Sequence, residues 1–338
     1  MDGSSVTRSV DDLDFRILAA IFGERLWRFT DWDPRISTRE IAARVGVAPS
    51  TVFERLSGWQ ASGFLQGYGV LPNPRLLGGR FVGHNVRLAD PSARKAFVEA
   101  AERIEGVFSF FHHANAWVSV MTFAQSAEAS WRQSEQVSRL EGGEHVEPPH
   151  VLPEIPPRGR NPDLLDWRIV KALAGWSGHS LVPVAEGLAV SERTVRRRYE
   201  RMMRDRIVWF FPFLDFAKVK GVVASLIVEF DPKVGYAAVA NAMRDRYRDT
   251  LRFLSGIETP AGEPYPIWQG LWCLDSVGQA ESLIQEVRAL PGVTSVEVSY
   301  PLRIEKARST WLADRFEAII RSVGQTQSVV RPPPEQVR

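Results

Sequence analysis

Hydrophobic residues near the N-terminus recur at helical spacing and predict a series of helices. The first begins at Asp11 or Asp12, either of which can serve as its N-cap. Its hydrophobic positions share one helical face: Leu13, Ile17, Leu18 and Ile21. A capping box formed by Ser37 and Glu40 predicts the start of a second helix, which ends at Gly46.

A third helix follows after a tight turn. It begins at Pro49, which suits a first helical turn, and stops at Gly63. Its inward side chains are spaced at i, i+4 and i+7: Val52, Leu56 and Trp59. The apolar run over residues 64–71 then predicts a short strand.

Helix, helix, tight turn, helix and strand is the order of a winged helix-turn-helix, in which the last helix enters the DNA major groove with its first residues. The outward positions of that helix are predicted DNA contacts: Ser50, Thr51, Phe53, Glu54 and Arg55. Hydroxyl and guanidinium groups bind base edges and phosphates. A three-helix packing unit without DNA contacts is the alternative interpretation of this segment.

The same phrase returns over residues 161–210, where the inward positions are Val195, Tyr199 and Met202. Seven arginines and three acidic residues lie between Ser191 and Arg206, so this copy is basic where the first is nearly neutral. Its predicted DNA contacts are Arg193, Thr194, Arg196, Arg197, Arg198 and Arg201. A charge run is usually a solvated face, which is the alternative reading. We favour DNA contact because the run lies on the expected reading helix.

Each helical unit is followed by alternating segments that predict the order β-α-β-β-α-β, a ferredoxin-like module. Two helices cover one face of such a sheet, and the other face is apolar and needs a partner. Two modules in one chain can cover each other. The predicted fold class is therefore α+β, with two winged helix-turn-helix domains alternating with two ferredoxin-like domains.

The predicted boundaries place the winged helix-turn-helix domains at residues 10–76 and 160–216 and the ferredoxin-like domains at 77–155 and 217–306. Residues 307–338 are expected to form an amphipathic helix followed by a disordered tail, and residues 1–9 are expected to be disordered. Six prolines between residues 147 and 163 predict a stiff linker between the copies.

The phrases LDFRIL, RIS, PSTVFERL and GFLQGYGVL, followed by a βαββαβ module, resemble the Lrp/AsnC family of transcriptional regulators. The resemblance covers residues 11–305 as two fused copies. It implies a DNA-binding regulator whose ferredoxin-like modules mediate homo-oligomer assembly and bind a small effector, often an amino acid. Because fused copies can diverge, we expect asymmetric rather than palindromic DNA sites.

The effector site is where this sequence departs from the family. The family usually carries a glycine-and-aspartate turn between the second and third strands of its module. Residues 112–120 lack both residues, and the equivalent turn within 256–270 is longer and rich in proline. The candidate effector residues are His112, His113, Asn115 and Trp268. Polar residues at a strand end, and an aromatic residue in a sheet core, are the alternative roles.

Two other classes of function stay open. Siroheme decarboxylases resemble the same architecture, and His112 or His113 would then be a proton donor. A co-regulator that binds another protein instead of DNA is the third. Phosphate-loop, nucleophile-elbow and paired-histidine motifs are missing from the sequence, so we expect no enzyme, cofactor or metal site.

Composition narrows the picture further. The formal net charge is only +2, so a DNA-binding surface must come from local clustering. The single cysteine, Cys273, excludes an intrachain disulfide and a multi-cysteine zinc site. The acidic start is unlike a signal peptide, and 18 consecutive apolar residues occur nowhere. These features favour a cytoplasmic protein without membrane partners.

Overall fold

The computed structural model describes residues 11–22, 37–151, 157, 159–174, 181–219, 221–234, 236–247, 251–261 and 264–330, and it has an α+β fold. The first helical unit contains α1 (Asp12–Phe22), α2 (Thr38–Val45) and α3 (Pro49–Ser62). The predicted capping box is confirmed, because the Ser37 hydroxyl accepts a hydrogen bond from the Glu40 amide at 3.1 Å. The aromatic-rich stretch before Ser37, the predicted disorder of residues 1–9 and most of the proline-rich linker lie outside the described residues.

The second helical unit repeats this order with α6 (Leu164–Ala174), α7 (Val182–Gly187) and α8 (Glu192–Arg204). Ser191 caps α8 through the amide of Thr194 at 3.2 Å. The three side chains predicted to face inward are buried: Val195, Tyr199 and Met202. Helical periodicity therefore located the inner face of α8 correctly.

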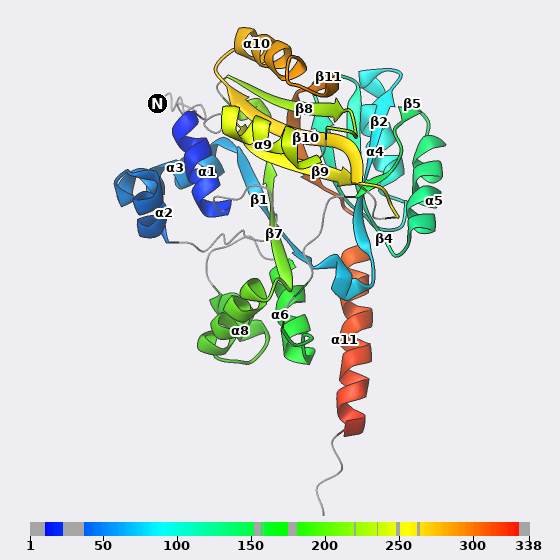
Figure 1. Cartoon of the computed structure of the whole chain (residues 1–338). Helices are drawn as coiled ribbons and strands as arrows, with labels where there is room; N and C mark the ends of the chain where they lie inside the picture. The colour runs from blue at the N-terminus through cyan, green and yellow to red at the C-terminus, as the bar shows by residue number, and fades with distance from the viewer. Residues whose placement is uncertain are drawn as a thin grey trace, which may run out of the picture.

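A two-stranded antiparallel ribbon joins the helical units. Strand β1 (Leu65–Pro72) pairs with β7 (Val208–Leu214), in a register that runs from Leu65 opposite Leu214 to Pro72 opposite Val208. Figure 1 shows this ribbon between the two helical units and the larger sheet. The buried residues of both helical units belong to one continuous hydrophobic cluster, which includes Val70, Leu71 and Leu214 of the ribbon.

After each ribbon strand, a 3-10 turn leads into a module of four strands and two helices. The first turn is η1 (Pro74–Leu77), and its module contains β2 (Arg80–Leu88), α4 (Arg94–Ala101), β3 (Val107–His113), β4 (Trp117–Ala124), α5 (Ala127–Ser138) and β5 (Gly143–Val146). The second turn is η3 (Phe216–Lys218), and its module contains β8 (Val222–Phe230), α9 (Tyr236–Arg246), β9 (Leu251–Glu258), β10 (Pro264–Leu274), α10 (Val277–Arg288) and β11 (Val293–Ser299). Both modules pair their strands in the same order, with the first strand between the fourth and the third.

Each module ends with a strand that reaches the other module. Strand β6 (His150–Val151) pairs with β2 and meets β9 at Val151 and Glu258, whereas β12 (Pro301–Lys306) pairs with β3. The apolar and β-branched residues of the segment 292–302 predict one strand, the last of the second module, but the structure divides it at Tyr300. The chain there leaves the edge of β8 and crosses to β3, so the strand cannot continue straight.

The C-terminal helix α11 (Trp311–Val330) connects the first module to the second helical unit. At its start, the Trp311 ring lies 5.1 Å from the ring of Phe123. Farther along, Phe316 packs near Trp167 of α6 at 6.3 Å, and Gly324 lies against Leu164. The predicted disorder from residue 324 is wrong as far as Val330, because the helix continues to that residue. None of the described helices is long and apolar enough to cross a membrane.

The helical units differ at the two turns that need a left-handed backbone. Gly46 and Gly63 adopt φ values of 76° and 73° in the first unit, and Ala189 and Arg206 adopt 54° and 57° at the aligned positions of the second. An L side chain in this conformation costs about 1–2 kcal/mol, which glycine avoids at the expense of some unfolded-state entropy.

We predict that Ala189→Gly and Arg206→Gly together stabilise the second helical unit by about 1 kcal/mol, measured by hydrogen exchange of α8 amides. Gly46→Ala makes the reverse change in the first helical unit and should lower the stability of that unit. A methyl group at this position meets no atom within 4 Å, so the expected loss of stability comes from backbone strain alone. A loss of protection in α8 of the double variant would contradict the strain argument.

Candidate nucleic-acid interface

Helix α3 presents a neutral to acidic face to solvent. Ser50 and Glu54 are exposed, Thr51 is half-buried, and Phe53 is 65% exposed. A single exposed ring of this kind is common on protein surfaces and does not by itself indicate a partner. The first three of these side chains offer hydroxyl and carboxylate groups near the helix N-terminus, where backbone amides also favour phosphate.

Helix α8 presents a basic face at the corresponding place. Arg193, Arg196 and Arg197 are exposed, and so is Arg204 near the helix end. Arg196 forms an ion pair with Glu192 one turn earlier. Both side chains are exposed, so this pair contributes little stability. Thr194 is half-buried, with its hydroxyl 2.9 Å from that of Ser191.

When α3 and α8 are aligned, the residues at the exposed positions differ in chemical type, whereas buried apolar residues stand at equivalent positions in both helices. The exposed arginines of α8 stand where α3 has Ser50, Phe53, Glu54 and Ala61. Inside, Val52 and Trp59 are buried like their counterparts Val195 and Met202. The same helical scaffold therefore carries two surfaces of opposite electrostatic character.

Arg55 does not face outward as predicted. Its side chain is only 7% exposed, and its guanidinium Nη1 donates to Asp11 Oδ1 at 2.7 Å and to Asp14 Oδ2 at 2.8 Å. The indole of Trp59 donates to the other oxygen of Asp14 at 2.8 Å. Arg55 therefore ties α3 to the start of α1.

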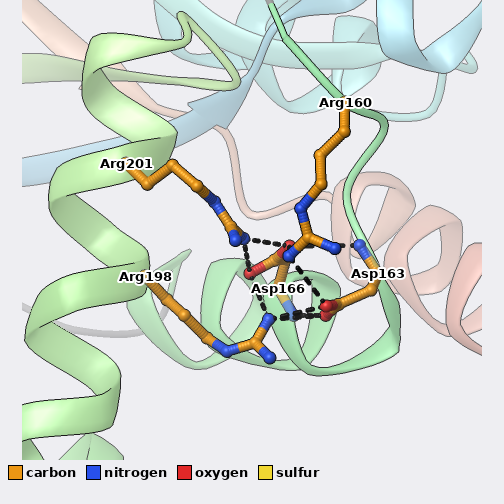
Figure 2. A network of polar contacts seen from close by, with 5 residues as sticks. All are labelled: Arg160, Asp163, Asp166, Arg198 and Arg201. Carbon is orange, nitrogen blue, oxygen red and sulfur yellow. Dashed lines mark hydrogen bonds and ion pairs between the residues drawn. The ribbon is translucent and has the colours of Figure 1, made fainter.

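In the second unit, Arg198 aligns with Arg55 and likewise ties α8 to the start of α6, with more partners (Figure 2). Arg198 Nη1 donates to both oxygens of Asp163 and to Asp166, each at 2.8 Å, and Arg201 donates to both oxygens of Asp166 at 2.6 Å. Arg160 approaches the same two carboxylates from the preceding loop. Asp166 is fully buried, and Arg198 and Arg201 are 19% and 23% exposed.

Helical geometry explains these corrections. Arg55 and Arg198 follow Val52 and Val195 by three residues, so they lie about 60° around the helix from the buried face. The i, i+4, i+7 spacing alone overlooked them. A usable signal was present: Asp11 and Asp14 have the same three-residue spacing as Asp163 and Asp166, and each pair lies at the start of the first helix of its unit.

These networks lower the pKa of one carboxyl group in each helical unit, Asp11 and Asp163. Burial acts to raise the pKa of Asp163, but hydrogen bonds and the charge of Arg198 outweigh it and lower the pKa to about 2. The pKa of Asp11 is also lowered, because Arg55 outweighs burial in the same way. The pKa values of Arg55 and Arg198 are raised by their carboxylate partners.

The candidate effector residues do not share one pocket. Neighbouring side chains of a strand point to opposite faces, so His113 borders a cavity lined by strands of both modules, while His112 lies on the helix-covered face with Phe110. In the same way Gln269 lines that cavity and Trp268 packs into the core of the second module. Asn115 is half-buried in the turn, where its backbone carbonyl accepts a hydrogen bond from Arg94 at 2.5 Å.

The cavity beside His113 is small and polar, with a volume of about 30 Å³. A hydrogen-bonded chain runs along its wall, in which Ser119 donates to Asn85 and Asn85 donates to Glu147, each at 2.7 Å. Burial raises the pKa of Glu147 and lowers the pKa of His113 to about 4. This volume suits a water molecule and excludes an amino-acid side chain in the conformation seen.

Comparison with known proteins places the first helical unit. Residues 10–57 match the family of winged helix-turn-helix DNA-binding domains. The leucine-responsive regulatory proteins of Escherichia coli K12 and Klebsiella pneumoniae are each 33% identical over 78 residues, which are 22% of this chain and 48% of each relative. The chain therefore spans about half the length of the curated relatives it matches. The N-terminal part carries a helix-turn-helix similar to that of a transcriptional regulator.

Among solved structures, the siroheme decarboxylase NirDL matches over 94% of this chain and the whole of the other, with a TM-score of 0.51 and 11% identity. The same enzyme in complex with an iron-uroporphyrin III analogue gives a TM-score of 0.50 over the same share. Likeness at this level of identity shows a shared fold and leaves the activity open.

We predict that Asp163→Asn lowers the stability of the second helical unit by about 2 kcal/mol at pH 7, measured by hydrogen exchange of α8 amides. A pKa depressed to about 2 contributes stability that is present above the unfolded value near 4 and lost as the pH falls through 2. The difference between wild type and variant should therefore shrink between about pH 4 and pH 2. Glu99→Gln, at an exposed site on α4, is the control and should show neither effect; a pH-independent difference would argue against ionisation as the cause.

Proposed function

We propose that this protein is a sequence-specific DNA-binding transcriptional regulator of Lrp/AsnC type in which α3 and α8 read unlike halves of one asymmetric site. The observation that carries the proposal is the contrast between the two helices. They share a buried scaffold, including a buried arginine on an aspartate pair, yet differ at the four exposed positions occupied by arginine in α8.

The exposed groups suit two kinds of contact. Arg193 and Arg197 are in no ion pair described in this structure, so their guanidinium groups are available for phosphates or for the paired acceptors of guanine. On α3, Ser50 and Thr51 offer hydroxyl donors, and the exposed ring of Phe53 suits apolar contact with a thymine methyl group. Affinity would come mainly from α8, and α3 would add selectivity.

The ribbon of β1 and β7 supplies the geometry for a single site. A symmetric homodimer must present the same helix to both half-sites, whereas one chain with two helical units is free of that restriction. The two units here are joined by backbone hydrogen bonds as well as by covalent linkage. Fusion of two Lrp/AsnC-type copies, assembly of several chains through the modules and control by an effector at the modules remain parts of the proposal.

In vitro selection from a random DNA pool tests the reading heads. We expect wild-type protein to enrich an asymmetric motif, and Arg193→Ala with Arg197→Ala to lose the part of the motif read by α8. The matched control makes the same pair of changes at two exposed arginines, Arg132 on α5 and Arg139 at its C-cap, and should leave the motif intact. A perfect inverted repeat would contradict two unlike heads.

Salt dependence of binding to the selected site gives a second measure. Each phosphate contact contributes about 0.9 to the slope of log affinity against log salt. We predict that Arg193→Ala with Arg197→Ala reduces this slope by about 2 and weakens binding at least tenfold. An unchanged slope would place the phosphate contacts on another surface.

A siroheme-decarboxylase-like enzyme is the second candidate, and two observations favour it. The fold agrees with NirDL over nearly the whole chain. In the first module, His112 is buried and its Nε2 lies 2.9 Å from Glu305, and the charges of Arg303 and Arg94 act on the same imidazole. The sequence had indicated that arginines were concentrated on α8, so these two were overlooked as possible partners of substrate carboxylates.

The histidines themselves are poorly placed for this chemistry in the conformation seen. Burial and then the charge of Arg303 lower the pKa of His112 to about 4, so its imidazole is neutral near pH 7 and is a weak proton donor. The cavity at His113 holds about 30 Å³, which is far below the size of a tetrapyrrole.

Titration with iron-uroporphyrin III, followed by its visible absorbance, separates the two functions. A regulator is expected to leave the spectrum unchanged at micromolar concentration and to bind the selected DNA. A saturable spectral change that Arg94→Gln weakens, together with absent DNA selection, would favour the enzyme.

A further inference from the structure

A cavity of about 240 Å³ lies where the second helical unit, the ribbon, the first module and the C-terminal helix meet. Its walls come from α6, β1, β7, β3, α11 and the end of β12. Most of the lining is apolar and includes three aromatic rings: Phe108, Phe213 and Phe316. In Figure 1 this region lies where the upper end of α11 approaches α6 and the lower end of the ribbon.

The charged groups of this cavity are all of one sign. Lys171 and Lys306 are in the lining and both are exposed, while no carboxylate belongs to the lining among the residues described. Lys171 is paired with Glu317, which lies outside the lining. Lys306 takes part in no ion pair within the described part of the chain, so its charge is free for a ligand.

From this combination we infer that the cavity is a binding site for a small apolar carboxylate. Its hydrocarbon part lies among the aromatic rings, and its carboxylate meets Lys306 at the mouth. An anion placed at the mouth keeps part of its hydration, so the cost of burying its charge is small. A neutral analogue of the same shape would gain the apolar contacts and lose the charge pair.

The volume limits the ligand to a small molecule. An apolar cavity of about 150 Å³ accepts a benzene molecule, and pockets for drug-sized ligands begin at about 300 Å³. A cavity of about 240 Å³ therefore fits one aromatic ring with a short chain. The site lies outside the small cavity beside His113, with which it shares no lining residue.

The position of the cavity gives the ligand a means of control, an effect that rests on the proposed DNA-binding function. Helix α6 carries Asp166, which holds Arg198 and Arg201 of α8. A ligand between α6 and α11 would contact the elements that set the position of α8 relative to β1. Binding would thereby change the spacing of the two reading helices if the two states differ in affinity for the ligand.

Isothermal titration calorimetry of the full chain tests the site with 4-phenylbutanoate, and 4-phenylbutanamide is the neutral control. We expect the carboxylate to bind with one site per chain and at least threefold more tightly than the amide. Lys306→Gln should remove this preference and leave the amide affinity unchanged. Lys95→Gln, an exposed lysine on α4, should change neither affinity.

Ala313→Trp provides an independent variant, because Ala313 lines the cavity from an exposed position of α11 where a larger side chain can enter the space without disturbing the core. We expect at least tenfold weaker binding of both probes, with an unchanged circular dichroism spectrum. Equal affinity for carboxylate and amide, or undiminished binding by Ala313→Trp, would overturn the assignment.

DNA affinity for the selected site, measured with and without 4-phenylbutanoate, then separates the two proposals. Calorimetric binding without DNA binding would leave the cavity assignment intact and remove the regulator. DNA binding without calorimetric binding would remove the cavity assignment alone.

Discussion

The antiparallel pairing of β1 with β7 is the constraint on which the rest of the structure depends. Each strand leaves a helical unit and leads into a module, so the register from Leu65 and Leu214 to Pro72 and Val208 fixes where all four parts of the chain lie. A shift by one residue would turn Val70 and Leu71 to the wrong faces and divide the hydrophobic cluster that both helical units share. The separation of α3 and α8 is thus set by backbone hydrogen bonds.

Within each helical unit, a buried ionic contact fixes the last helix, α3 or α8, against the first helix of the same unit. Asp14 and Asp166 are almost completely buried, and each accepts a hydrogen bond from an arginine of α3 or α8 in its own unit. Such networks specify one arrangement more than they add stability, because desolvation offsets much of the attraction. Two arginines of α8, Arg198 and Arg201, are used in these contacts. The exposed surface of α8 is therefore less basic than the composition of the helix indicates.

The two halves of the molecule are unlike in more than their exposed charges. Helix α11 reaches from the first module to α6 and forms one wall of the aromatic cavity. The final strands also cross between modules, since β12 joins the edge of β3 and β6 meets β9. The position of the second helical unit therefore depends on the first module as well as on the ribbon, because α11 contacts both.

The sequence by itself determined the local features of this protein. Spacing of apolar residues, capping residues and glycines located the helices of both units and the βαββαβ order, because these signals act within a few residues of the chain. It also predicts DNA contacts at Ser50, Glu54, Arg193 and Arg197, and the structure leaves these four side chains exposed. Only the tertiary structure decided which charged side chains remain outside. Arg55, Arg198 and Arg201 turn inward because they pair with aspartates. These partners lie more than thirty residues away in sequence, so the local spacing of each helix does not reveal them. The same holds for the crossing of β12 to β3 and for the cavity beneath α11, since both arise from surfaces that meet only after the elements have packed.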